Sequence, residues 1–276
     1  MDVQELRIPI RGDKFSLNAS VLALLHHRDT EFQTIDIYDT DVFGKALLLD
    51  GHIQFTLFDE HAYHESLVQI PLLNLPAAKR ALVIGGGDGG VIRELCKHAS
   101  MEEIHMVEID AGVIEACASA LPEMNAGAFD DPRVKVFVED AFGFVKNASV
   151  PYDLIVADST DVYENEVGGL SEALFTEAFY ADCLRLMSES GMLVTQADNL
   201  VFCPYSLDAI LAMFGKVFPK TGAYQAIVPS FGGFSGFAWA SKGAALSPRL
   251  PSGTGSIPLR YLNEATYAFA FSPLSF

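Results

Sequence analysis

The sequence predicts an α/β protein in which a small antiparallel β unit precedes a larger part built on a mainly parallel sheet. The chain has 276 residues and half of them are hydrophobic, which is ample for a buried core. Short alternating runs fill its first 60 residues, whereas apolar strand-like runs alternate with helix-length stretches from residue 61 onward. We therefore expect two domains, residues 1–60 and residues 61–276.

Alternation in the N-terminal part is typical of strands with one buried face. Runs of this kind lie at residues 32–37 and 45–49. Asp50 and Gly51 separate the second run from another at 52–56, and an Asp-Gly pair between alternating segments favours a tight hairpin. These residues predict an antiparallel β domain.

Five apolar runs in the larger part have the length of buried strands, at 81–85, 104–108, 134–138, 154–157 and 192–196. Helix-length segments such as 171–188 separate them, as expected of parallel strands joined by crossover helices. Two more strands, near 224–229 and 236–240, are joined only by the Gly-rich link 230–235, so we expect an antiparallel pair. A parallel sheet that ends in such a pair indicates a Rossmann-like fold of the methyltransferase type. Residues 244–258 predict a surface loop before a short C-terminal segment.

Charge and composition exclude several classes of partner. The chain has 18 Lys and Arg residues against 36 Asp and Glu, so we expect no nucleic-acid partner, because phosphates are bound by clustered basic residues. Small polycations fit a charge of −18 better, although acidity alone also keeps proteins in solution. No stretch approaches the roughly 20 apolar residues of a membrane helix, and the start resembles no signal peptide. We therefore expect a cytoplasmic protein without a membrane partner.

The cysteines predict neither a disulfide framework nor a metal site. They are widely scattered, each lies in an apolar segment, and none forms a C-x-x-C pair. We expect reduced core thiols and no bound metal; the four residues are Cys96, Cys117, Cys183 and Cys203.

A glycine-rich turn at residues 85–90 follows the apolar run 81–84 and precedes a helical segment that begins at Val91. In this strand-to-helix setting, a G-x-G-x-x-G pattern favours a nucleotide or nucleoside site. A phosphate would require backbone N–H groups without a nearby anion, yet Asp88 places a carboxylate inside the turn. We therefore expect the ligand at the turn to carry a positive charge.

Further carboxylates follow the predicted strands, at the edge where ligands bind in such sheets. Glu108 ends the second strand, at the distance from the turn typical of a ribose-binding acid, although Glu108 or Asp110 could instead start a helix. Asp140 follows the third strand and could accept from an adenine amine or cap a helix. Asp158 and Asp161 follow the fourth strand, where they suit a cationic amine or a helix cap.

Taken together, several blocks of the chain resemble the polyamine aminopropyltransferases, the spermidine synthase family. The blocks occur in the family's order, and the similarity extends over nearly the whole chain. A G-x-G-x-x-G pattern alone is a weak signal, whereas the ordered set is specific. The blocks are residues 43–54, 59–65, 85–90, 108–110 and 158–161, with a tail at 259–264 similar to the family's closing segment.

This resemblance implies a reaction. The aminopropyl group of decarboxylated S-adenosylmethionine, a co-substrate rather than a permanently bound cofactor, would pass to a small di- or polyamine and release 5′-methylthioadenosine. Asp158 would be the general base, assisted by Tyr63. The resemblance also implies a homodimer or homotetramer.

Ligand-binding residues also follow from the matched motifs. The donor would be bound by Gln33, Gly85, Asp88, Glu108, Asp140 and Ala141. The acceptor amine would be bound by His64, Asp88, Asp158, Ser159, Thr160, Asp161 and Phe231.

Three departures from the family pattern leave the acceptor open. The loop after Asp161 lacks proline and carries Glu164 and Glu166, which could bind a distal ammonium or face water. Phe231 stands where a tyrosine is usual, and Asp198 replaces the more usual glutamate. Two other functions stay open as well: an S-adenosylmethionine-dependent methyltransferase on the same fold, and a non-catalytic polyamine or nucleoside sensor.

Overall fold

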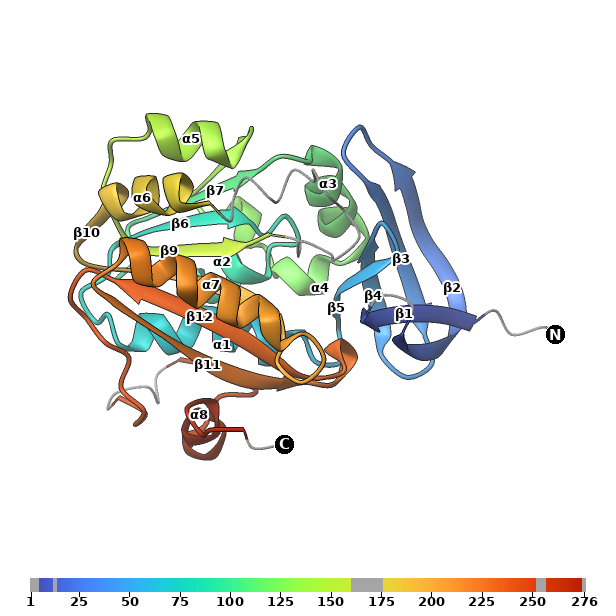
Figure 1. Cartoon of the computed structure of the whole chain (residues 1–276). Coiled ribbons are helices and arrows are strands. Elements are labelled where there is room, and N and C mark those ends of the chain that lie inside the picture. The colour runs from blue at the N-terminus through green and yellow to red at the C-terminus, as the bar shows by residue number, and fades with distance from the viewer. Residues whose placement is uncertain (1–4, 12–13, 160–175, 252–256, 275–276) are drawn as a thin grey trace.

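The structure, a computed structural model, describes residues 5–11, 14–159, 176–251 and 257–274. A five-stranded N-terminal sheet stands beside a seven-stranded sheet that is flanked by helices on both faces (Figure 1). The expected α/β architecture, with a small antiparallel sheet ahead of a Rossmann-like part, is confirmed.

All neighbouring strands of the N-terminal sheet are antiparallel, in the order β1-β2-β3-β4-β5. Asp50 and Gly51 have φ angles of 50° and 78°, the left-handed conformation that a tight hairpin between β4 and β5 requires. We had not assigned the first two strands from the sequence. In the second of them Leu22, Leu24 and Leu25 are exposed, so its hydrophobic residues do not alternate with polar ones in the regular way that identifies a strand. The strands are β1 (Glu5–Arg11), β2 (Phe15–Asp29), β3 (Thr34–Thr40), β4 (Gly44–Leu49) and β5 (His52–Thr56).

The larger sheet has the order β11-β12-β10-β9-β6-β7-β8. Its strands β10, β9, β6, β7 and β8 are parallel, while β12 is antiparallel to both β10 and β11, as the short link had predicted. The strands are β6 (Arg80–Gly85), β7 (Glu103–Glu108), β8 (Val134–Val138), β9 (Tyr152–Asp158), β10 (Met187–Asn199), β11 (Lys220–Val228) and β12 (Gly233–Ser241).

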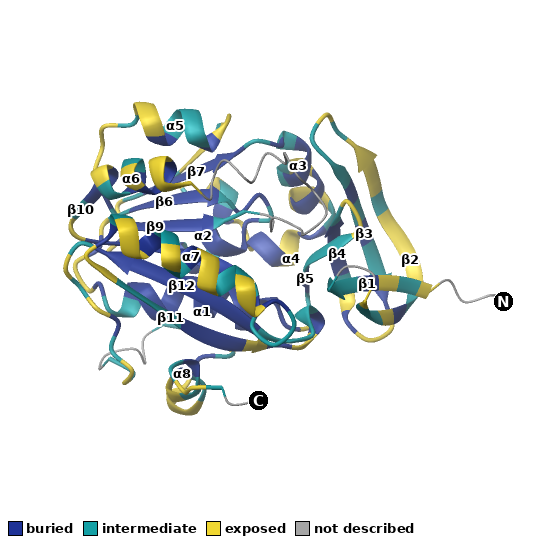
Figure 2. Ribbon diagram, in the orientation of Figure 1, coloured by how far each residue is buried: buried dark blue, intermediate teal, exposed yellow. Residues whose placement is uncertain are grey.

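The strands of this sheet are largely buried (Figure 2). Their residues alternate between two cores, one on each face of the sheet. In β6, Ala81 and Val83 contact the core formed with α1 and α2, whereas Leu82 and Ile84 contact the core formed with α5, α6 and α7. The helices are α1 (Glu60–Leu73), α2 (Gly90–Cys96), α3 (Ala111–Ala120), α4 (Pro122–Asn125), α5 (Ala141–Asn147), α6 (Glu177–Leu186), α7 (Pro204–Val217) and α8 (Glu264–Ala270).

A separate core joins the two sheets. Ile37, Leu47 and Phe55 of the N-terminal sheet pack against Val113 and Cys117 of α3. The β5 strand ends at Thr56 and α1 begins at Glu60, so the division between residues 60 and 61 falls at the first residue of α1, just after the short connection 57–59. The assignment of residues 1–60 and 61–276 as two domains stays a prediction.

Several smaller expectations can be compared with the structure. The C-terminal segment contains the helix α8, which the sequence analysis did not assign. All four cysteines lie among the described residues and are free thiols, three of them buried. No helix in the described ranges is long and apolar enough to cross a bilayer.

Candidate active site

Strand register brings the predicted residues to one edge of the large sheet. Gly85 at the end of β6 pairs with Asp158 at the end of β9. On the other side of β9, Ala157 pairs with Thr195, which places Gln196 of β10 beside Asp158. Glu108 ends β7 next to β6. The carboxyl ends of these parallel strands therefore lie at one edge of the sheet, where ligands bind in sheets of this type.

The glycine turn contacts the end of strand β9 at this edge of the sheet. Gly85 and Gly86 have φ angles of 78° and 71°, and Gly86 N–H donates to the carbonyl oxygen of Asp158 at 3.1 Å. A Cβ atom at Gly85 would lie 2.3 Å from that same oxygen, so no larger residue fits here. The carboxylate of Asp88 accepts from the N–H of Gly90, the first residue of α2, at 2.6 Å.

Tyr63 and Asp158 form the pair that the sequence had singled out. The Tyr63 hydroxyl, on α1, donates to Asp158 Oδ1 at 2.5 Å. Burial raises the pKa of Asp158 to about 6, and the charge of Asp88 adds to this rise, while His64 and the Tyr63 hydroxyl oppose it. At neutral pH most Asp158 side chains are therefore ionised, yet the group readily takes up a proton, as a general base must.

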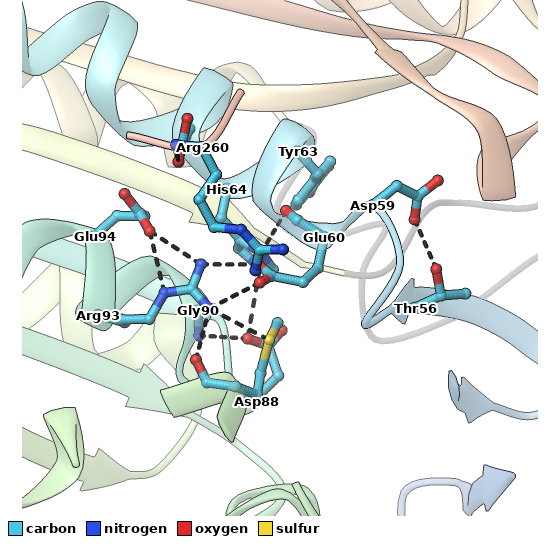
Figure 3. A network of polar contacts seen from close by, with 12 residues as sticks. Thr56, Asp59, Glu60, Tyr63, His64, Asp88, Gly90, Arg93, Glu94 and Arg260 are labelled. Atoms are coloured by element: carbon cyan, nitrogen blue, oxygen red, sulfur yellow. Dashed lines mark hydrogen bonds and ion pairs between the residues drawn. The ribbon is translucent and has the colours of Figure 1, made fainter. Parts of the chain in front are cut away.

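His64 lies behind Asp88 and is only 1% exposed (Figure 3). Its Nδ1 contacts the carbonyl oxygen of Glu60 at 2.9 Å and Glu60 Oε2 at 3.0 Å, and its Nε2 lies 3.5 Å from Asp88 Oδ1. The described residues that line the pocket do not include His64, so a direct contact with an acceptor amine stays a prediction.

Three ionisable side chains lie close together at this corner of the site. His64, Asp88 and Asp158 each offer one ligand atom, and these atoms lie within 4.8 Å of one another. The sequence analysis expected no metal, and that expectation stays a prediction.

On the side of the site where the sequence predicts a nucleoside, Glu108 is buried, and its carboxylate accepts from the N–H groups of Gly87 at 3.2 Å and Asp110 at 3.0 Å. Burial raises the pKa of Glu108 to about 7. Asp110 caps α3 by accepting from Gly112, so of the two acids Asp110 is the one that starts the helix. Gln33, in the turn between β2 and β3, donates to Asp110 Oδ2 at 3.0 Å, which brings the N-terminal sheet to the nucleoside edge.

Asp140 has the alternative role that the sequence had left open. Its side chain accepts from the N–H groups of Phe142 and Gly143 and caps α5, and it is exposed, while the neighbouring Ala141 is buried. A contact with adenine remains compatible with this position, because a cap leaves lone pairs on the carboxylate available.

Between the two sheets lies an open pocket of about 100 Å³. Ser159 and Phe231 line it, and the Phe231 ring contacts the Tyr63 ring with centroids 5.5 Å apart. Thr160, Asp161 and the two loop glutamates lie outside the described residues. The remaining lining residues are Pro9, Ile10, His52, Ile53, Gln54, Tyr63, Asp88, Asp158, Gln196, Asp198, Asn199 and Ser235.

The sequence analysis missed the part of the wall that the N-terminal sheet supplies. Ile10 comes from β1, and His52 and Gln54 come from β5. Both β5 residues belong to the block 43–54 that carried the resemblance, so the motif contained the signal. Ile10 had no such signal. Asp198 has a φ of 61° at an irregularity of β10, a strained conformation often found in binding sites.

Two family models match the chain. The spermidine synthase tetramerisation domain matches residues 8–56, and the spermine/spermidine synthase domain matches residues 60–248.

Relatives and solved structures agree with these matches. The polyamine aminopropyltransferase of Pectobacterium carotovorum is 42% identical over 228 residues, which cover 82% of this chain and 78% of the relative. That of Serratia proteamaculans is 40% identical over 263 residues, 92% of this chain and 89% of the relative. A spermidine synthase solved with the transition-state analogue AdoDATO has a TM-score of 0.89 at 28% identity, covering 99% of this chain and 93% of its own. The spermidine synthase of Thermotoga maritima gives 0.88 at 28% identity, with 99% and 92% covered. This chain therefore belongs to the spermine/spermidine synthase family.

Proposed function

We propose that this protein is a polyamine aminopropyltransferase. It moves the aminopropyl group of decarboxylated S-adenosylmethionine to a di- or polyamine and releases 5′-methylthioadenosine. One observation carries the proposal: the hydrogen-bonded pair Tyr63 and Asp158 faces a pocket beside Asp88 at the glycine turn. The names of the relatives support it.

The chemistry needs little more than positioning and one proton transfer. The sulfonium of the donor is already a good leaving group, so a neutral amine held in line with the methylene carbon is sufficient for displacement. Amines of this type have a pKa near 10 and arrive protonated. Asp158 takes the proton, and Tyr63 holds its carboxylate in place through the 2.5 Å hydrogen bond.

On the donor side, Asp88 binds the ammonium of the aminopropyl chain. Glu108 binds the ribose hydroxyls, and Gln33 closes over them from the N-terminal sheet. Asp140 and Ala141 contact the adenine, and Gly85 lets the backbone approach the nucleoside closely. Buried Glu108 and half-buried Asp88 have the exposure that such contacts require.

On the acceptor side, Ser159 and Phe231 form part of the pocket wall and His64 lies next to Asp88. Thr160 and Asp161, which lie outside the described residues, are proposed to bind the amine on the strength of the motif alone. Phe231 offers an apolar ring without a hydroxyl, which suits the methylene part of an amine better than its ammonium. We therefore propose an acceptor other than putrescine, with Glu164 and Glu166 as a second anionic subsite.

A methyltransferase is the second candidate, because the sheet has the same type. Methyltransferases commonly carry an acid two residues before the first glycine of the turn, and here that residue is Val83, which is fully buried in the core. Asp88 would also repel the amino-acid carboxylate of S-adenosylmethionine. Both features favour the decarboxylated donor.

One experiment tests the function. The protein is incubated with decarboxylated S-adenosylmethionine and a panel of amines (putrescine, cadaverine, agmatine and a triamine), and the products are identified by mass. We expect an aminopropylated amine and 5′-methylthioadenosine. Methylated product from S-adenosylmethionine would favour the methyltransferase, and binding without any product would favour a sensor.

The N-terminal sheet supports self-association. It matches the tetramerisation-domain model, and its strand β2 exposes Leu22, Leu24 and Leu25. We propose a homotetramer, with the homodimer as the alternative. Light scattering on a size-exclusion column distinguishes the two, and Leu24→Asp should lower the mass of the particle.

A further inference from the structure

His64 is surrounded by hydrogen-bond acceptors. Its Nδ1 faces two oxygens of Glu60, and its Nε2 faces Asp88 Oδ1. A backbone carbonyl and an ionised carboxylate only accept hydrogen bonds, so Nδ1 must carry a proton. If the imidazole were neutral, Nε2 would then direct a lone pair at the oxygen of Asp88, which is electrostatically unfavourable.

Other groups around the ring leave it little freedom to avoid Asp88. A Cβ atom at Gly90 would lie 2.5 Å from Nε2, so the ring packs directly on the backbone at the start of α2. The rings of Tyr63 and Phe55 contact it edge-on, with centroids 5.1 Å and 6.5 Å away. The orientation of Nε2 toward Asp88 is therefore fixed by packing.

Charge balance also favours a second proton on His64. Arg93 from α2 binds both oxygens of Glu60, at 3.1 Å and 2.8 Å, and so neutralises that carboxylate. Within the described ranges, the other titratable groups that face His64 are Tyr63 on α1, Asp88 in the turn after β6 and Asp158 at the end of β9. Two neighbouring carboxylates in a poorly hydrated site are costly without a cation. Asp88 raises the pKa of His64 to about 10 against the opposing effect of burial, and Glu60 contributes to the rise.

We propose that His64 is an imidazolium in the unliganded site, that it holds the place of a substrate ammonium beside Asp88, and that binding of the cationic donor expels its second proton to solvent. This inference deepens the proposed function and rests on it, because it takes the donor ammonium to Asp88. The donor replaces one positive charge with another, so the charge around the two carboxylates is conserved. His64 is thus a positioning residue that keeps Asp88 ionised and oriented until the donor arrives.

A direct measurement on the unliganded protein tests whether His64 is an imidazolium there. In ¹⁵N NMR spectra of histidine-labelled protein, both ring nitrogens of His64 should resonate as protonated at pH 8, and the signal is assigned by its loss in His64→Asn. Should that variant fail to fold, long-range couplings within the ring and contacts to Phe55 assign it. A neutral ring at pH 8 would overturn the proposal.

Calorimetry tests whether donor binding releases the second proton of His64. Titrations of decarboxylated S-adenosylmethionine at pH 8 in two buffers of different ionisation enthalpy should show release of about one proton per donor bound. Donor affinity should rise about tenfold from pH 7 to pH 8, while the donor ammonium stays charged. 5′-Methylthioadenosine, which lacks the ammonium, should release none.

Two variants complete the design. His64→Asn should abolish proton release, whereas His98→Asn should leave it unchanged, because His98 contacts Gln69 at the far side of the same helix pair. Equal release with both ligands, or none with the donor, would overturn the proposal. Product formation by the same protein sample is measured separately: turnover without proton release contradicts only this inference, whereas absence of donor binding and turnover contradicts the proposed function.

Discussion

Two kinds of carboxylate surround helix α1, and they have different partners. Asp59 and Glu65 are buried acids that accept from backbone N–H groups and, in the case of Asp59, also from the hydroxyls of Thr56 and Ser230. Glu65 accepts from the N–H groups of residues 260, 261 and 262, and Asp59 accepts from the N–H and hydroxyl of Ser230. By contrast, the pocket acids Asp88 and Asp158 face side chains that titrate, a histidine and a tyrosine.

This difference distinguishes acids that stabilise the fold from acids that can take part in proton transfer. A backbone amide does not gain or lose a proton in the physiological range, so its bond to a carboxylate holds the chain in one arrangement at any working pH. Histidine and carboxylates do exchange protons there, so the pocket can respond to a cationic ligand. Asp59 and Glu65 should therefore govern stability, whereas Asp88 and Asp158 should govern turnover.

The largest effect should come from Asp158→Asn. The amide keeps the shape of the side chain but takes no proton, so we expect kcat to fall about 10²–10⁴-fold while donor binding is retained. Rapid-quench measurement of product, with calorimetry for the donor, checks this.

Asp153→Asn is the matched control on the same strand. Asp153 accepts from the N–H groups of Lys79 and Arg80, so its loss should lower stability and leave kcat nearly unchanged. If the two variants lost turnover equally, the distinction between the two kinds of acid would fail.

A smaller effect, on stability alone, is expected for Glu65→Gln. The amide presents one N–H₂ group to backbone donors and leaves at least one of them unpaired in a buried site, which costs about 1–3 kcal/mol. The urea midpoint should fall, while activity per folded molecule is retained. Glu31→Gln, at an exposed acid, makes the same change in charge and should shift stability by less than about 0.5 kcal/mol.

The smallest effect concerns pH. Since Asp158 must be ionised to act, kcat/KM for the amine, measured at saturating donor, should fall as pH drops through the Asp158 pKa of about 6. The Tyr63 hydroxyl lowers that pKa by hydrogen bonding to the ionised form. In Tyr63→Phe the acid limb of the profile should therefore move upward by about one pH unit. A limb that stays in place would show that the hydroxyl does not stabilise the carboxylate.

Much of the site's frame could be predicted from sequence because local patterns determine it. Alternation and apolar runs predicted the strands, and the glycines at 85–90 predicted the turn between β6 and α2. Helix α8 also had a readable signal, since Asn263 and Thr266 form a capping box at its start.

Contacts between distant segments could not be predicted this way. The bond between Asp59 and Ser230 spans 171 residues, and the contact of Ile10 with the pocket depends on how the two sheets pack. The proton count of His64 likewise depends on three elements meeting in space. The spacing of residues along the chain does not show which distant segments contact one another in the fold.

The anchoring of Glu65 has a consequence for how the protein is made. Its three partners follow it by 195 to 197 residues, so at about 5–20 residues per second the ribosome delivers them some 10–40 s later. During that interval the Glu65 carboxylate is hydrated, and the helix that carries Tyr63 and His64 lacks the hydrogen bonds to residues 260–262. The helix that carries Tyr63 and His64 is thus anchored only after residues 260–262 have been synthesised, so this part of the pocket reaches its final arrangement late in folding.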